Sequence, residues 1–217
     1  MHNTLEVNSI YKSVVSGFKL SDISLICETG DIIGIFGRNG SGKSLLLKTI
    51  FGTTDAENKF IKINKKIADK LYLVPKAVVH LPQQTFLPKH TTVHKIISLY
   101  FHKDHSDFTK DPILRNLLSL KVAELSAGEL RYFELKLILL TEAKFALLDE
   151  PLSQLSPLIK EQALHLIKKA SLQKGIILCD HDYFSLSTQI THTLLMHAGS
   201  LKKIRCETEL KFWNYLP

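Results

Sequence analysis

Residues 37–44 have the types and the spacing of a loop that binds phosphate groups. They read Gly37-Arg38-Asn39-Gly40-Ser41-Gly42-Lys43-Ser44, which fits the pattern G-x-x-x-x-G-K-[ST] at every fixed position. In such a loop backbone N–H groups surround the anion, the lysine reaches the β- and γ-phosphates, and the hydroxyl binds Mg²⁺. We therefore expect Lys43 and Ser44 to hold a nucleoside triphosphate together with its magnesium ion.

A second pair of reactive groups, Asp149 and Glu150, follows the apolar run at residues 145–148. A carboxylate at the C-terminal end of a strand, beside a phosphate loop, is placed to bind Mg²⁺. We predict that Asp149 is this ligand and that Glu150 orients or deprotonates the attacking water. The alternative is a strand that ends in a solvated acidic turn.

The elements that must position these groups can be read from the apolar pattern. Before the loop, residues 31–36 form an apolar run typical of a buried strand, and residues 45–50 continue as a helix. A strand, a glycine loop and a helix N-terminus in this order direct backbone dipoles at one anion. The alternative at this point is a glycine-rich strand-to-helix turn without a ligand.

Further elements alternate along the chain. Buried strands are expected at residues 77–81, 145–148 and 176–179, antiparallel strands near residues 5–10 and 18–26, and a hairpin at residues 59–67. The spacing predicts that residues 92–140 are mostly helical and that a helix covers residues 157–170. Strands that alternate with helices indicate an α/β fold with a mainly parallel sheet.

Composition limits the class of protein. The chain has 217 residues, 45% of them apolar, which suits one α/β domain with a buried core. Its net charge of +7 favours anionic partners. The densest basic stretch, residues 59–76, nevertheless has the alternation of a half-exposed hairpin, so nucleic acid is not the expected partner.

The sequence also bears on location. No apolar run approaches the ~18–20 residues of a membrane span, and residues 1–6 contain no apolar signal core. Three cysteines without a paired spacing fit a reducing compartment. We expect a protein that is made and kept in the cytosol.

Residues 125–129, Leu-Ser-Ala-Gly-Glu, resemble the signature of the ATP-binding-cassette (ABC) ATPase family, which usually reads Leu-Ser-Gly-Gly-Gln. In that family the serine and second glycine reach the γ-phosphate held by a partner protomer, which implies this role for Ser126 and Gly128. Ala127 departs from the pattern by one methyl group. Glu129 replaces the usual glutamine and occurs among the family's variants.

The resemblance covers essentially the whole chain and implies a fold. This fold is the α/β P-loop NTPase (RecA-like) fold, with a mainly parallel sheet, an N-terminal antiparallel β subdomain and a small helical subdomain. Within the single domain of residues 1–217, the nucleotide-binding core would comprise about 1–84 and 141–217. The helical subdomain would comprise about 85–140.

Other family motifs appear in the same order. The resemblance places the Q-loop glutamine, which contacts Mg²⁺ and the attacking water, at Gln83, with Gln84 as the competing choice. It places the switch histidine, which binds the γ-phosphate and positions Glu150, at His181. The D-loop falls at residues 153–156, where Ser156 stands in place of the family's usual aspartate.

Two positions outside the fixed pattern concern the nucleotide. Tyr11 sits where the family keeps an aromatic residue that stacks on adenine, although it could equally be a core residue. Leu45 replaces a threonine that often contacts the α-phosphate, and the missing hydroxyl should weaken nucleotide affinity by ~1 kcal/mol. The resemblance thus assigns ATP to Tyr11, residues 37–45, Ser126 and Gly128.

The implied function is ATP hydrolysis in a head-to-tail dimer with a second copy or a homologous cassette. Closure of the dimer would drive separate transmembrane permease subunits, and the chain would be peripheral on the cytosolic face of the membrane. Residues 83–88 would form part of the groove that receives a helix of the permease. Phe86 and Leu87 are either anchors in that groove or core residues.

The alternative is a soluble ABC ATPase that acts on a scaffold, a ribosome or nucleic acid. Chromosome-maintenance relatives insert hundreds of coiled-coil residues between the two halves, and the short stretch between Gln83 and Ser126 argues against them. Translation-factor relatives carry two cassettes, and this chain has room for one. An assembly-scaffold ATPase stays open as an alternative, and the sequence does not reveal a cargo.

Overall fold

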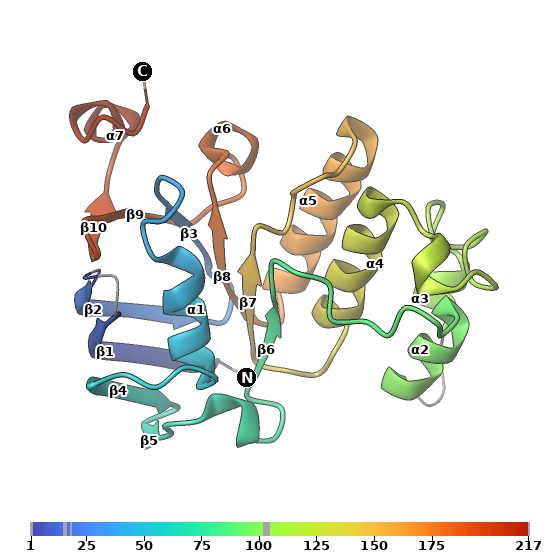
Figure 1. The fold of residues 1–217 in the computed structure, drawn as a ribbon, viewed down its shortest axis with the longest axis horizontal. Helices are drawn as coiled ribbons and strands as arrows, with labels where there is room; N and C mark the ends of the chain where they lie inside the picture. Colours follow the sequence, from blue (N-terminus) through green and yellow to red (C-terminus); the bar gives the residue numbers. More distant parts are fainter. Residues whose placement is uncertain (1, 15–16, 18, 102–104, 217) are drawn as a thin grey trace.

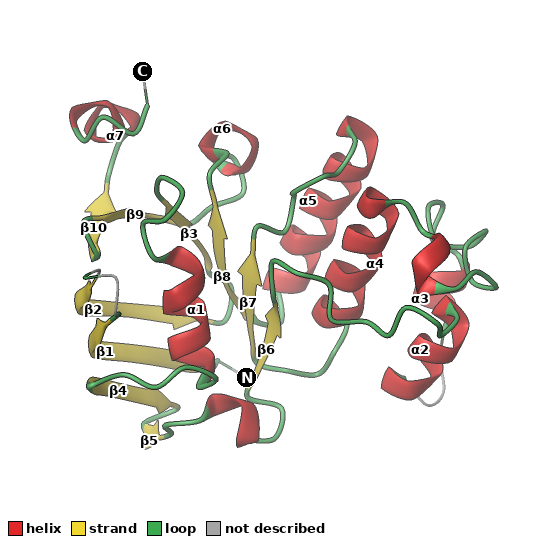
Figure 2. Ribbon diagram, viewed as in Figure 1, coloured by secondary structure: helices red, strands yellow, loops and turns green. Residues whose placement is uncertain are grey.

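The computed structural model describes residues 2–14, 17, 19–101 and 105–216, and their strands form two sheets (Figures 1 and 2). The smaller sheet is antiparallel, with the strand order β2-β1-β4-β5. Its strands are β1 (Thr4–Ser13), β2 (Lys19–Glu28), β4 (Asn58–Ile63) and β5 (Lys66–Ile67). The expected N-terminal antiparallel unit is therefore confirmed.

The larger sheet has six strands in the order β10-β9-β3-β8-β7-β6. Five of them run parallel, and β10 pairs antiparallel with β9 at one edge. Its strands are β3 (Ile32–Phe36), β6 (Val78–Leu81), β7 (Phe145–Asp149), β8 (Gly175–Asp180), β9 (His192–His197) and β10 (Ser200–Ile204). Strands β3, β7 and β8 are buried along their whole length, as the continuous apolar runs predicted.

Helices cover both faces of the parallel sheet, and α2 and α3 lie beyond α4 at one side of the molecule (Figure 1). Helix α1 (Lys43–Phe51) lies between the two sheets, where Leu46, Leu47 and Ile50 are fully buried. On the other face, α4 and α5 pack against each other beside β6 and β7. The longer helices are α2 (Val93–Tyr100), α4 (Ala127–Leu139) and α5 (Pro157–Ser171), and the short ones are α3 (Ser106–Thr109), α6 (Tyr183–Leu186) and α7 (Glu207–Phe212).

The segment 92–140 is mostly helical, as its apolar spacing predicted, but its helices are separated by a stretch of turns. Between α3 and α4 the chain forms turns and one short 3₁₀ helix at Val122–Glu124. Here the carboxylate of the buried Asp111 accepts hydrogen bonds from the backbone N–H groups of Ile113 and Leu114 and from the side chains of Tyr132 and Lys136. A buried polar centre thus organises this turn in place of a helix. The boundaries of the helical subdomain, about 85–140, remain a prediction.

Within the described ranges, no helix combines the length and the apolar character that crossing a membrane requires.

Candidate nucleotide site

The loop 37–42 connects β3 to α1 and has a backbone that requires glycine. Gly40 and Gly42 have φ angles of 79° and 101°, in the left-handed region that residues with a Cβ avoid. Gly42 also occupies the N-cap position of α1. The unpaired N–H groups of the first helical turn therefore face the same end of the sheet as the loop, which is the geometry of an anion site.

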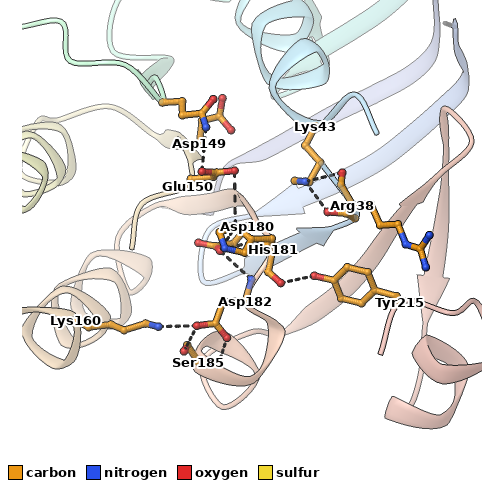
Figure 3. A network of polar contacts seen from close by, with 12 residues as sticks. Arg38, Lys43, Asp149, Glu150, Lys160, Asp180, His181, Asp182, Ser185 and Tyr215 are labelled. Atoms are coloured by element: carbon orange, nitrogen blue, oxygen red, sulfur yellow. Dashed lines mark hydrogen bonds and ion pairs between the residues drawn. The ribbon is translucent and has the colours of Figure 1, made fainter. Parts of the chain in front are cut away.

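Lys43 lies inside this loop. Its Nζ donates hydrogen bonds to the carbonyl oxygens of Gly37 at 2.6 Å and Arg38 at 3.3 Å, and the residue is 6% exposed (Figure 3). The ammonium group is thus held within the loop by backbone dipoles. A phosphate oxygen at this position would take over some of these hydrogen bonds.

Asp149 ends β7 next to the loop and is almost completely buried. Burial raises the pKa of its carboxyl group, and a hydrogen bond from the Ser44 hydroxyl opposes this rise. Its Oδ1 atom is buried and has no hydrogen-bond partner among the described residues. A buried carboxylate oxygen without a partner, beside a serine hydroxyl, is a donor set that suits a hard cation.

Glu150 is held in an unusual backbone conformation. Its φ angle is 49°, which is uncommon for a residue other than glycine and stores strain. Its N–H donates to the carbonyl of Cys179 at 2.8 Å. The guanidinium group of the buried Arg131 donates to the carbonyl oxygens of Asp149, Glu150 and Pro82. The structure therefore fixes the backbone from which the Glu150 carboxylate projects.

Two side chains from other elements meet this carboxylate. Gln83, which follows β6, donates from Nε2 to Oε2 of Glu150 at 3.1 Å. His181, which follows β8, places Nδ1 3.8 Å from the other oxygen, Oε1 (Figure 3). Asp180 orients the histidine loop, since its Oδ1 accepts from the backbone N–H groups of His181 and Asp182. Three parallel strands thus bring Gln83, Glu150 and His181 together.

A pocket of about 460 Å³ opens in front of the loop. Its lining consists of Val14, residues 39–45, Gln83 and Glu150. Tyr11 is 45% exposed on β1 and is not among the lining residues, whereas Val14 is. Gln84 lines a neighbouring pocket together with Ala127, Arg131 and Gln154. The structure therefore brings Gln83, and not Gln84, to the phosphate loop.

The segment 125–129 forms the N-terminus of α4, away from this pocket. Ser126 is the N-cap residue and forms a capping box with Glu129, because its Oγ donates to Oε2 of Glu129 at 2.6 Å and accepts from the Glu129 N–H. A Cβ atom on Gly128 would lie 2.9 Å from the carbonyl oxygen of Gln154. Neither Ser126 nor Gly128 lines the phosphate pocket of the same chain.

The sequence did not single out two residues that belong to this region. Arg131 looks like a polar position on a helix, although the cluster of three backbone carbonyls that it binds makes it central to the Glu150 turn. Tyr215 donates its hydroxyl hydrogen to the carbonyl of His181. No pattern around either residue distinguishes it from an ordinary side chain before the fold is known.

A phosphate loop at one end of a parallel sheet, two carboxylates at the end of β7, and a capped Ser-x-Gly segment on a separate helix define an ATP-binding-cassette ATPase. The ABC transporter family profile matches residues 20–153, which is more than half of the chain. The chain therefore belongs to the ABC transporter family, as the resemblance of its motifs indicated.

Curated relatives agree with this assignment. The chain is 28% identical to the molybdenum import ATP-binding protein ModC of Rhodopseudomonas palustris (strain ATCC BAA-98 / CGA009), over 97% of this chain and 61% of that protein. It is 30% identical to the hemin import ATP-binding protein HmuV of Chelativorans sp. (strain BNC1), over 90% of this chain and 82% of that protein. The chain thus spans about three fifths of the length of the molybdenum import protein.

Solved structures show the same fold. A nucleotide-free ATP-binding cassette from an ABC transporter superposes with a TM-score of 0.81 at 23% identity, over 99% of this chain and 96% of that one. An ATP-binding subunit of an ABC transporter gives a TM-score of 0.79 at 20% identity, over 97% and 93% of the two chains. The expected P-loop NTPase fold of the cassettes is confirmed.

Proposed function

We propose that this chain is the ATP-hydrolysing, nucleotide-binding subunit of a membrane transporter. The observation that carries the proposal is the convergence of Gln83 and His181 on Glu150, beside a phosphate loop, in a chain of the ABC transporter family. The names of the relatives describe ATP-binding subunits of import systems, and this supports a role in transport. The cargo would be recognised by the membrane subunits.

In this proposal the loop binds the phosphates of ATP. The N–H groups of residues 39–44 would surround the phosphate oxygens, and Lys43 would move from the carbonyls of Gly37 and Arg38 to the β- and γ-phosphates. Leu45 lines the pocket without a hydroxyl group to offer the α-phosphate. Tyr11, whose side chain is exposed on β1, would stack on adenine, a role that rests on the family resemblance alone.

Asp149, Ser44 and Gln83 would hold the magnesium ion. The buried, unpartnered Oδ1 of Asp149 and its hydrogen bond with Ser44 fit this role, because an oxygen ligand set is what Mg²⁺ prefers. When bound, the ion supplies neutralisation of the charge on the transferred phosphoryl group. Arg131 keeps the Asp149 backbone in place from behind.

Glu150 would accept a proton from the attacking water or orient that water for in-line attack. The Gln83 amide donates a hydrogen bond to one of its carboxylate oxygens, and the His181 ring lies 3.8 Å from the other. When ATP arrives, these two side chains would turn to the magnesium ion and to the γ-phosphate, which would release Glu150 toward the water. The site is therefore preorganised around the base.

A second protomer would complete the site. Ser126 and Gly128 do not line the phosphate pocket of their own chain, so the resemblance is satisfied by a head-to-tail dimer with a second copy or a homologous cassette. The close approach of Gly128 to Gln154 joins the signature segment to the D-loop within one protomer. Closure of this dimer on ATP would be the work-producing movement.

A groove of about 830 Å³ offers a docking place for a helix of a transmembrane partner. It is lined by residues 72–76, Val78, Val79, Tyr100, Phe101 and residues 140–143. The side chains of Tyr72, Leu73 and Tyr100 are exposed in this groove. Of the two anchors considered in the sequence, Phe86 is 37% exposed outside the groove and Leu87 is a buried core residue. Since β6 connects the groove to Gln83, movement of the partner would reach the nucleotide site. The chain would then be peripheral on the membrane.

The test is affinity purification of the tagged Glu150→Gln variant from its native host, with ATP and after mild detergent treatment. Mass spectrometry would identify the chains that co-purify. We expect a stoichiometric polytopic membrane protein. Ribosomal, nucleic-acid-binding or scaffold partners in its place would contradict the transport role and leave the ATPase assignment intact.

A further inference from the structure

The C-terminal residues 213–216 touch both loops that handle the phosphates. The guanidinium Nη2 of Arg38, in the phosphate loop, donates to the carbonyl oxygen of Asn214 at 2.8 Å. The hydroxyl group of Tyr215 donates to the carbonyl oxygen of His181 at 2.7 Å (Figure 3). Asn214 and Tyr215 are thus hydrogen-bonded to the phosphate loop and the histidine loop, which lie far apart in the sequence.

The segment is itself fixed to the protein. The Trp213 ring lies 5.1 Å from the His197 ring, and Lys202 Nζ lies 5.9 Å from the Trp213 ring, so β9 and β10 hold it from below. Asn214 turns the chain with a φ angle of 52°. The Tyr215 ring then packs against Phe36, the last residue of β3, at a centroid distance of 6.3 Å. The position of the hydroxyl group is therefore set by packed rings.

The Tyr215 hydroxyl group is a permanent donor at neutral pH. Burial, with the nearby carboxylates of Asp180 and Asp182, raises the pKa of Tyr215 to about 12. A protonated phenol can only donate to the carbonyl of His181, which has no hydrogen to give in return. Tyr215 is consequently the donor and the His181 carbonyl the acceptor at every physiological pH.

The histidine loop is also held from the opposite side. Lys160, on α5, donates from Nζ to Oδ2 of Asp182 at 2.6 Å, and Ser185 also bonds Asp182. With Asp182 held by α5 and the His181 carbonyl held by Tyr215, the backbone around His181 has little freedom left. The imidazole ring remains the movable part, 3.8 Å from Glu150.

We propose that Tyr215 is a positioning residue for His181, and that residues 213–216 connect the phosphate loop to the histidine loop through Arg38 and Tyr215. Tyr215 acts through the His181 backbone, to which its hydroxyl group donates. A shift of the loop on ATP binding would pass from Arg38 to Asn214 and Tyr215 and so to His181. The expected effect of Tyr215 on ATP hydrolysis rests on the proposed function, whereas its contact with the His181 backbone does not.

The first test does not depend on turnover. Tyr215→Phe removes the hydroxyl group and keeps the ring against Phe36, whereas Lys211→Ala is a matched control on an exposed side chain of α7. We expect amide hydrogen exchange over residues 180–186 of the full chain to be several-fold faster in Tyr215→Phe and unchanged in Lys211→Ala. Unchanged exchange in Tyr215→Phe would overturn the anchoring role.

The second test measures steady-state ATP hydrolysis. Loss of one neutral hydrogen bond predicts a kcat about fivefold lower in Tyr215→Phe, with the KM for ATP unchanged. In a His181→Ala background the same substitution should lower kcat no further, because its effect on turnover passes through His181. Additive losses, or a raised KM, would overturn the proposal. A wild-type chain without turnover would instead contradict the ATPase function, and hydrogen exchange would still decide the anchoring.

Discussion

Gln83 and Glu150 are joined by a hydrogen bond of 3.1 Å between Nε2 and Oε2. The two residues follow β6 and β7, which are neighbouring strands of the parallel sheet. The Q-loop amide therefore occupies one oxygen of the expected general base. In the proposed function, a membrane partner that moves β6 or the Q-loop would change what Glu150 can bind, and this contact would couple the partner to hydrolysis.

The amide variant Glu150→Gln tests the role of this carboxylate. We expect ATP hydrolysis to fall at least about 100-fold, the range that general base catalysis supplies, while the affinity for ATP changes little. Turnover is measured by phosphate release and affinity by titration with a fluorescent ATP analogue. Glu161→Gln, an exposed position on α5, is the matched control. Full turnover by Glu150→Gln would rule out Glu150 as the base.

Lys43→Ala should weaken nucleotide binding. The ammonium group is held by the carbonyls of Gly37 and Arg38, and its loss removes a charge-assisted contact to the phosphates. Such contacts contribute ~1.5–3 kcal/mol, so we expect the dissociation constant for ATP to rise roughly 10- to 100-fold. Calorimetric titration measures it, with Lys48→Ala on the exposed face of α1 as the control. An unchanged dissociation constant would contradict the placement of the phosphates.

Glu129→Gln tests whether the carboxylate beside Ser126 opposes pairing of two protomers. The capping box accepts glutamine as well as glutamate, so α4 should begin normally. The substitution removes a negative charge where the γ-phosphate of the partner would lie. In a Glu150→Gln background we expect dimers to form at about threefold lower ATP concentration, measured by light scattering. Dimers that form at higher ATP concentration would show that the carboxylate assists pairing.

The sequence predicted the phosphate end of the fold well, because its signals are local. The loop 37–44 needs glycine for its backbone, and apolar runs of strand length before it and before Asp149 leave few alternatives. The hairpin expected at residues 59–67 is also confirmed, and its turn lies at Asn64 and Lys65, which have positive φ angles of 51° and 68°. Positions that require an unusual backbone conformation can therefore be predicted from the residue type.

The sequence predicted poorly what depends on long-range polar contacts. Asp111 replaces part of an expected helix by binding Lys136 and Tyr132, which lie in a different element. Arg131 and Tyr215 bind backbone carbonyls, and a carbonyl carries no sequence signature. Ser156 directly precedes α5, and its side chain makes no capping hydrogen bond. Such contacts appear only after the chain has folded.

His80 predicts a pH dependence of stability. It is a residue of β6, and its ring packs against Phe51 of α1 with 5.2 Å between the ring centroids. Burial, with the nearby positive charges of Lys48 and Arg131, lowers the pKa of His80 from 6.5 to about 4. In the unfolded chain the imidazole keeps an ordinary pKa near 6.5.

The sign of the effect follows from proton binding. Between pH 6.5 and pH 4 the unfolded chain takes up a proton at His80 that the folded chain refuses, so the free energy of unfolding falls as the pH falls. We expect a loss of roughly 2 kcal/mol over this range from His80. His80→Leu should remove this part of the dependence, measured by urea unfolding at pH 7, 5.5 and 4.5. His90→Leu, at an exposed position, is the control. Equal slopes in wild type and His80→Leu would show that the histidine is not kept neutral by the fold.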